Sequence, residues 1–348
     1  MKLGIIGLPL SGKSIVFAAL TGARGEKEGQ ASSRSDPRIA TVTVLDERID
    51  FLAGLYQPKK TTYAKIEYLL PSEIPGPIPS KSEGGIWNQV RACDALLQVV
   101  RNFRSPGGPP PTPEKDFWQA EEEMILSDLA VAEKKMERLE LDKKRGKKQE
   151  GKERVLIESC LETLGKGEPL RNNQELANER ALKGFTFLSA KPVLIILNND
   201  DEDETLPAWD RKPVGSELIA VRAKLEKDIA SMPPEEAAEF LVAYHIEESA
   251  LDRVIKSSYR LLNRISFFTV GPDEVKAWPI TAETPAVEAA GTIHSDIEKG
   301  FIRAETISFK DLQTYGSFQE AKKAGIVRLE GKDYKVRDGD IINFRFNV

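Results

Sequence analysis

Residues 7–14 of the chain read Gly-Leu-Pro-Leu-Ser-Gly-Lys-Ser, a complete match to the pattern G-x-x-x-x-G-K-S. The apolar residues 2–7 predict a buried strand before it, and residues 13–20 predict a helix after it. In that context the glycines let the backbone curl so tightly that its N–H groups point inward at the helix N-terminus. The stretch therefore predicts a phosphate-binding loop in an α/β fold.

The side chains of this loop have separate predicted roles. Lys13 is expected to reach the β- and γ-phosphates of a nucleotide, and the Ser14 hydroxyl is expected to ligate Mg²⁺. Ser14 is the one metal ligand that the sequence predicts. The predicted phosphate-binding residues are Gly7, Leu10, Ser11, Gly12, Lys13, Ser14 and Ile15.

Short apolar runs alternate with helical patterns over much of the chain, which is typical of a parallel sheet with helices on its faces. We expect irregular loops at the polar stretch 25–36 and at the proline-rich stretch 71–85. Further strands are expected at residues 40–45, 63–70, 95–100, 192–197 and 217–221, and further helices at residues 46–55, 87–93 and 173–187 and up to about residue 263.

A helical insertion is expected after the proline-rich linker 105–111. Apolar residues spaced by three and four positions from residue 117 onward, and again over residues 153–164, predict two antiparallel helices. Their connection is basic: residues 131–155 hold ten Lys and Arg against six Asp and Glu. This tip is either a solvated helix connection or a contact for a phosphate backbone.

From residue 267 the pattern changes to short strands and turns, which indicates a separate α+β module. The predicted organisation is therefore a P-loop domain over residues 1–116 and 172–266, a helical coiled-coil insertion over residues 117–171 and a C-terminal module over residues 267–348.

A second motif follows the expected strand 192–197. Asn198 and Asp201 keep the spacing of the N-K-x-D element with which GTPases bind guanine, while Asn199 replaces the Lys. Ala223, within Arg-Ala-Lys after the strand 217–221, occupies the place of the S-A-K loop behind the base. The predicted base-binding residues are Asn198, Asn199, Asp201 and Ala223; the alternative is an Asx-rich turn that ends a strand.

Composition excludes several classes of protein. The chain has 348 residues, a net charge of −5, two Cys and two His, which argues against a disulfide framework, a zinc site, a Ser-His-Asp hydrolase and a protein that reads DNA sequence. No apolar run approaches the ~18 residues of a membrane span. We expect a cytoplasmic, monomeric, multidomain protein with no membrane association.

The C-terminal sequence identifies a resemblance. Residues 294–305 (HSDIEKGFIRAE), 329–334 (LEGKDY) and 339–348 (GDIINFRFNV) resemble nearly fixed segments of the YchF group of Obg-related P-loop NTPases, also called Obg-like ATPases. The resemblance spans the whole chain. It implies a G domain, a coiled-coil arm and a C-terminal TGS module with a ubiquitin-like β-grasp fold. It also implies ATP or GTP as ligand, Mg²⁺ as cofactor, and association with the ribosome or ribosomal RNA through the basic arm tip and the TGS module.

The chain also departs from that family. Leu10 and Ser11 stand where Asn and Val are usual, and Leu70 stands where the switch II Asp is expected. Residues 73–76 (Glu-Ile-Pro-Gly) restore an acid-x-x-Gly spacing three positions late, and the first switch has only Ser32, Ser33 and Ser35 as candidate hydroxyls. The family has an apolar residue in place of a hydrolytic Gln, so no catalytic residue is predicted.

Two functions remain open at this point. The first is a purine-nucleotide-binding switch protein of the YchF type that hydrolyses ATP or GTP slowly because its switch regions are degenerate. The second is a hydrolysis-deficient pseudo-GTPase scaffold that binds the ribosome or RNA without turnover, which Leu70 favours. A nucleotide kinase is disfavoured because no Arg-rich lid follows.

The preferred base is also open. A carboxylate at Asp201 accepts two N–H donors from guanine, which favours GTP. The resemblance favours ATP, because relatives usually carry N-x-x-E at this place. Asn199 lacks the aliphatic stem that covers a base, and Glu202 is an alternative acid.

Overall fold

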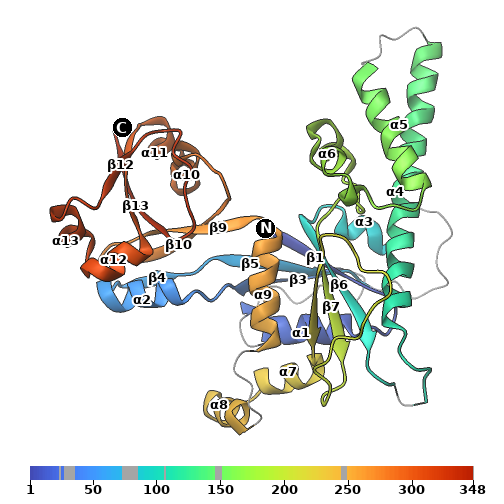
Figure 1. Ribbon diagram of the computed structural model, residues 1–348, viewed down its shortest axis with the longest axis horizontal. Coiled ribbons are helices and arrows are strands. Elements are labelled where there is room, and N and C mark those ends of the chain that lie inside the picture. The colour runs from blue at the N-terminus through green and yellow to red at the C-terminus, as the bar shows by residue number, and fades with distance from the viewer. Residues whose placement is uncertain are drawn as a thin grey trace. The chain divides into compact units, whose positions relative to one another are not determined.

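The computed structural model describes residues 1–22, 25–26, 36–72, 85–105, 107–145, 151–243 and 249–347 (Figure 1). Within it the chain forms two compact units. The first comprises Met1–Val42 and Glu67–Ser257, and the second comprises Thr43–Ile66 and Ser258–Val348.

The first unit is built on a seven-stranded sheet with the order β2-β3-β5-β1-β6-β7-β8. Strand β1 pairs in parallel with β5 and β6, and the parallel pairing continues through β7 to β8. The carboxyl ends of these strands therefore meet at one edge of the sheet, where α/β proteins bind ligands. The strands are β1 Lys2–Ile6, β2 Gly25–Glu26, β3 Arg38–Thr43, β5 Lys65–Leu70, β6 Ala95–Asn102, β7 Val193–Asn199 and β8 Glu217–Val221.

Helices cover this sheet, and every residue of β7 is buried, as expected of a central parallel strand. Helix α1 packs against α7, and α4 packs against β6. No described helix is both long and apolar enough to cross a membrane. Apart from the short helices after the insertion, the first unit contains α1 Lys13–Gly22, α3 Ile86–Val90, α7 Ala223–Ala230 and α8 Pro234–Ala243, and α9 Ala250–Leu261 begins in it.

The helical insertion is confirmed as a hairpin. Helices α4 (Pro113–Lys144) and α5 (Gly151–Gly165) bury a shared apolar seam that includes Ala132, Ile157 and Cys160. Helix α4 begins at Pro113, four positions before the expected start, because proline is favoured in the first helical turn.

The helix expected at residues 173–187 is wrong in detail. The chain forms two short pieces there, α6 Gln174–Asn178 and η2 Arg180–Phe185, directly after η1 Leu170–Asn172. Side chains interrupt a longer helix, because Asn173 accepts from the Leu176 N–H and Glu179 accepts from the Ala181 N–H.

The second unit contains a six-stranded mixed sheet with the order β12-β11-β13-β9-β10-β4. The antiparallel pair β9–β10 and the C-terminal β13, parallel to β9, give the β-grasp arrangement, whose core includes Phe267, Ala290 and Phe344. The strands are β4 Lys60–Thr62, β9 Arg264–Thr269, β10 Glu274–Thr281, β11 Phe301–Ser308, β12 Arg328–Glu330 and β13 Asp340–Phe346, and the helices are α2 Glu47–Tyr56, α10 Ala286–Ile293, α11 Ser295–Lys299, α12 Phe309–Tyr315 and α13 Phe318–Lys323.

This second unit extends beyond the predicted module 267–348, because it includes residues 43–66. Strand β4 pairs in parallel with β10, and Phe51 packs edge-on against Phe309. Arg48 donates to both carboxylate oxygens of Asp338 at 2.7 and 3.3 Å. The domain boundaries at residues 116, 171 and 266 stay predictions.

Candidate nucleotide-binding site

The loop between β1 and α1 has a backbone that only glycine tolerates at two points. Gly7 has a φ of 146° and Gly12 a φ of 93°, both in the region that favours glycine. A Cβ at Gly7 would lie 2.3 Å from the Val99 carbonyl oxygen, and one at Gly12 would lie 2.2 Å from Asn198 Nδ2. The motif glycines thus let this loop approach the backbone of β6 and the side chain of Asn198 near the end of β7 closely.

The side chains of the loop suit an anionic ligand. Lys13 is buried and its Nζ donates to the Leu8 carbonyl oxygen at 2.9 Å, so the ammonium folds back over the loop. The Ser11 hydroxyl is buried and has no hydrogen-bond partner among the described residues. Ser14 is exposed at the start of α1. A nucleotide phosphate and its Mg²⁺ therefore fit this loop. Leu10 and Ile15 lie at its exposed rim.

The Asn198 side chain, near the end of β7, connects the phosphate loop to the start of α7. Its Nδ2 donates to the Ser11 carbonyl oxygen at 3.1 Å, and its Oδ1 accepts from the Ala223 N–H at 3.3 Å. Asn198 is almost fully buried. One amide thus brings together the phosphate loop, the end of β7 and the start of α7. The contacts of Asn198 and Ala223 with a base stay predictions.

Asp201 lies beside the start of α7. Its Oδ1 accepts from the Leu225 N–H at 3.2 Å, and its Oδ2 accepts from Lys224 Nζ at 3.1 Å. The hydrogen bond to Asp201 raises the pKa of Lys224, so the ammonium stays charged. Asp201 remains 37% exposed and Lys224 70% exposed. The carboxylate therefore faces solvent with a cation next to it.

Asn199 occupies a different environment from Asn198. Its Nδ2 donates to the carbonyl oxygens of Asp203 and Thr205 at 3.0 and 2.9 Å, and its Oδ1 accepts from Asn102 Nδ2 at 3.0 Å. This buried amide stabilises the acidic loop after β7. A contact between Asn199 and a base stays a prediction.

Phe103 is a candidate that the sequence motifs did not identify. Its Cε1 lies 3.6 Å from the position of a Cβ on Gly12, so the ring borders the phosphate loop. It directly follows β6, whose carboxyl end lies at the ligand edge of the sheet. An aromatic residue just after a central parallel strand is the signal that could have found it.

Few residues that could ligate a metal ion lie near the loop in the described part of the chain. Leu70, at the carboxyl end of β5, is buried and offers no carboxylate. No cluster of three or more His, Cys, Asp or Glu that could hold a metal is found among the described residues. Glu73 and Gly76 lie outside the described residues, as do Ser32, Ser33 and Ser35.

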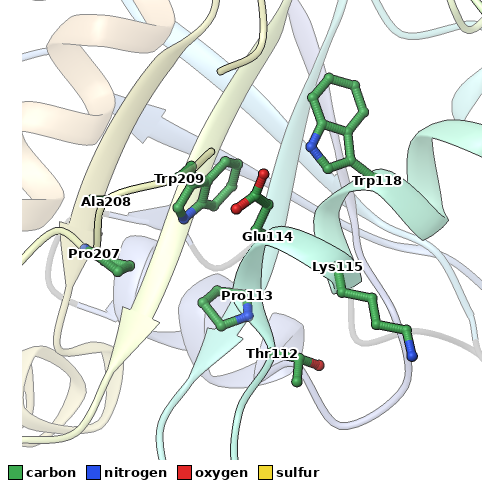
Figure 2. Close-up of a pocket in the computed structure, with 8 residues that line it drawn as sticks. All are labelled: Thr112, Pro113, Glu114, Lys115, Trp118, Pro207, Ala208 and Trp209. Carbon is green, nitrogen blue, oxygen red and sulfur yellow. The ribbon is translucent and has the colours of Figure 1, made fainter. Parts of the chain in front are cut away.

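A shallow cavity of about 570 Å³ lies at the start of α4 (Figure 2). Trp118 and Trp209 line it, with Glu114 between them, and the Glu114 carboxylate accepts from the Asp210 and Arg211 N–H groups at 3.0 and 2.8 Å. Arg211 stacks on the Trp118 ring at 3.7 Å. These contacts hold the loop after β7 onto α4, and none of the predicted site residues lines this cavity.

Comparison with known proteins identifies relatives over the whole chain. The family YchF-GTPase_C, described as a protein of unknown function (DUF933), matches residues 264–347. The chain is 39% identical over 363 residues to the ribosome-binding ATPase YchF of Escherichia coli O157:H7, covering 100% of this chain and 99% of that protein. It is 37% identical over 368 residues to Obg-like ATPase 1 of Oryza sativa subsp. japonica, covering 100% and 92%.

A solved structure extends the comparison to the fold. The Schizosaccharomyces pombe YchF GTPase superimposes with a TM-score of 0.84 at 29% identity, covering 99% of this chain and 97% of that one. The likeness in sequence and in fold thus extends over both compact units, including the helical insertion. The chain therefore belongs to the YchF family of Obg-like ATPases.

Proposed function

We propose that this protein is a ribosome-associated switch of the YchF type that binds ATP or GTP with Mg²⁺ and hydrolyses it slowly. The observation that carries the proposal is the loop of residues 7–14, with glycines at φ 146° and 93° and a buried Lys13, joined by Asn198 to the start of α7. Relatives over the full chain are named ribosome-binding ATPases, which supports the partner.

Different residues of this chain bind the phosphates, the metal ion and the base. The backbone N–H groups of the loop and Lys13 hold the phosphates, and the Ser14 hydroxyl holds Mg²⁺, which supplies charge neutralisation at the phosphates. We propose that Asp201 and Ala223 contact the base, while Phe103 borders the phosphate loop at Gly12 and Asn198 joins that loop to the start of α7.

We expect slow hydrolysis because of the residue at the carboxyl end of β5. An acidic residue there normally holds Mg²⁺ through its carboxylate, and the apolar Leu70 provides none. The same observation favours the second candidate, a pseudo-GTPase scaffold without turnover. Single-turnover phosphate release distinguishes the two, because only the switch releases phosphate at a rate that depends on Mg²⁺.

The arm supports the ribosomal partner. Lys143, Lys144 and Arg145 are exposed at the end of α4, next to residues 146–150, which lie outside the description. Such a cationic tip favours a ribosomal RNA backbone, with affinity that falls as salt rises. The TGS-like module is a second contact, and association with ribosomes places the protein in the cytoplasm, where we propose that it acts as a monomer.

Calorimetric titration with non-hydrolysable ATP and GTP analogues, with and without Mg²⁺, tests the proposal. We expect saturable binding that strengthens with Mg²⁺, and we expect ribosome co-sedimentation that weakens in a Lys143→Glu/Lys144→Glu variant. Lys115→Glu, at the opposite end of α4, is the matched control. Absence of binding to both analogues would refute the nucleotide switch.

A further inference from the structure

The shallow cavity at the start of α4 is lined by two tryptophans whose indole N–H groups have no acceptor. Neither Trp118 Nε1 nor Trp209 Nε1 has a hydrogen-bond partner among the described residues, although surrounding atoms cover both nitrogens and Trp209 is only 7% exposed. Figure 2 shows the nitrogen edge of Trp118 on the side of Glu114, and that of Trp209 on the side of the two lining prolines. Buried indole N–H groups usually have a partner, so these two donors indicate a ligand that carries acceptors.

The rest of the cavity wall is mainly apolar. Prolines from both chain segments, Pro113 and Pro207, lie in the lining, and Phe117 packs against both indole rings, with its centroid 4.9 Å from Trp118 and 5.3 Å from Trp209. The Arg211 guanidinium already covers one face of Trp118 at 3.7 Å, so a flat nucleobase cannot stack on that face. A shallow groove lined by tryptophan and proline fits an extended peptide better than an enclosed small molecule.

A proline-rich segment carries the complementary groups. In the polyproline II conformation its carbonyl oxygens make no internal hydrogen bonds, and its prolines have no N–H that would need an acceptor. The proline linker of this chain shows the same property, because the carbonyl oxygens of Pro109 and Pro110 accept from the Arg101 guanidinium at 3.2 and 3.4 Å. Carbonyl oxygens of such a segment can accept from the two indole N–H groups while its rings pack on the indole faces.

We propose that this cavity, lined by residues 112–115, Trp118 and residues 207–209, is a docking site for a proline-rich segment of a partner protein, with a basic residue of that segment paired to Glu114. The Glu114 carboxylate is held in the lining by the Asp210 and Arg211 N–H groups at 3.0 and 2.8 Å, and its remaining lone pairs can accept from a cation. The inference does not depend on the nucleotide site, because none of the predicted site residues lines this cavity.

Tryptophan-to-phenylalanine variants test the two donors. Fluorescence anisotropy of a labelled decaproline peptide that ends in arginine, titrated with the full chain, measures the dissociation constant. Trp209→Phe keeps an aromatic ring and removes one N–H, so we expect affinity to fall about fivefold, as for the loss of one hydrogen bond. Trp118→Phe, at a half-buried position, should have the same effect and replaces Trp209→Phe if that variant does not fold. Trp278→Phe is the matched control and leaves affinity unchanged, because the Trp278 N–H already donates to Thr269 Oγ1 at 2.9 Å in the second unit.

Glu114→Gln tests the charge at the same cavity. The glutamine side-chain oxygen still accepts from the loop N–H groups, while the negative charge is lost. We expect the wild type to prefer the peptide with arginine over decaproline alone, and this variant to lose the preference. Absence of saturable binding to either peptide below about 1 mM overturns the inference, and so does an equal loss of affinity in Trp278→Phe. Displacement of the peptide by a purine nucleoside assigns the cavity to a base and overturns it as well.

Discussion

Asn198→Ala is the most direct test of the connection between the phosphate loop and the start of α7. The Asn198 amide makes two hydrogen bonds, to the Ser11 carbonyl oxygen at 3.1 Å and from the Ala223 N–H at 3.3 Å. Alanine removes both bonds and leaves the Ser11 carbonyl oxygen and the Ala223 N–H without this partner. Ser11 and Ala223 are both buried.

The size of the effect follows from these two bonds. Each contributes about 1 kcal/mol net, and a buried group left without a partner costs about 1–3 kcal/mol. We therefore expect the free energy of unfolding to fall by roughly 2–4 kcal/mol. Because the phosphate loop and the start of α7 also lose their common anchor, nucleotide affinity should fall about ten- to thirtyfold, equivalent to about 1.4–2 kcal/mol.

Asn199→Ala is the matched variant. Its amide makes three hydrogen bonds, to Asn102 at the end of β6 and to the Asp203 and Thr205 carbonyl oxygens in the acidic loop. Urea unfolding should show a comparable loss of stability, and calorimetry should show a change in nucleotide affinity below about threefold. Equal losses of affinity in the two variants would refute the assignment of Asn198 as the specific connection between the two subsites.

Three further predictions address other parts of the molecule. Lys13→Ala should weaken nucleotide binding by about 2–4 kcal/mol, since a buried cation is lost from the phosphates, and unchanged affinity by calorimetry would remove the phosphate-loop assignment. Leu70→Asp should raise the rate or the Mg²⁺ dependence of phosphate release above a wild-type rate slower than the ~3–5 × 10⁻⁴ s⁻¹ of unassisted Ras, and robust wild-type hydrolysis would show that another acid serves. Arg48→Ala should lower the free energy of unfolding by about 2 kcal/mol, because Arg48 is bonded to both Asp46 and Asp338; thermal unfolding measures this, with the exposed Lys59→Ala, which removes only a surface ion pair to Asp273, as control.

The determinants of the predicted phosphate loop are local in the sequence. Two glycines with positive φ, a lysine and a serine lie within eight positions between a strand and a helix, so pattern and mechanism coincide. The N-x-x-D spacing selected Asn198, but it could not show which loop each of the two amides reaches. Successive side chains of a strand point to opposite faces, so Asn198 reaches the phosphate loop and Asn199 the acidic loop.

Residues 43–66 show where local patterns stop being informative. Their helix α2 was predicted correctly from its own periodicity, yet the chain on either side of the segment belongs to the first compact unit and the segment itself to the second. What assigns it is the three-residue strand β4 on β10 and the pairing of Arg48 with a carboxylate 290 positions away. Strand pairing across such a separation depends on the partner's register, which no window of sequence contains. The assignment also describes how the chain passes between the two units. Strands β3 and β5 enter and leave this segment, and both lie in the sheet that carries the phosphate loop, so the ends of one short stretch are held by the first unit and its middle by the second.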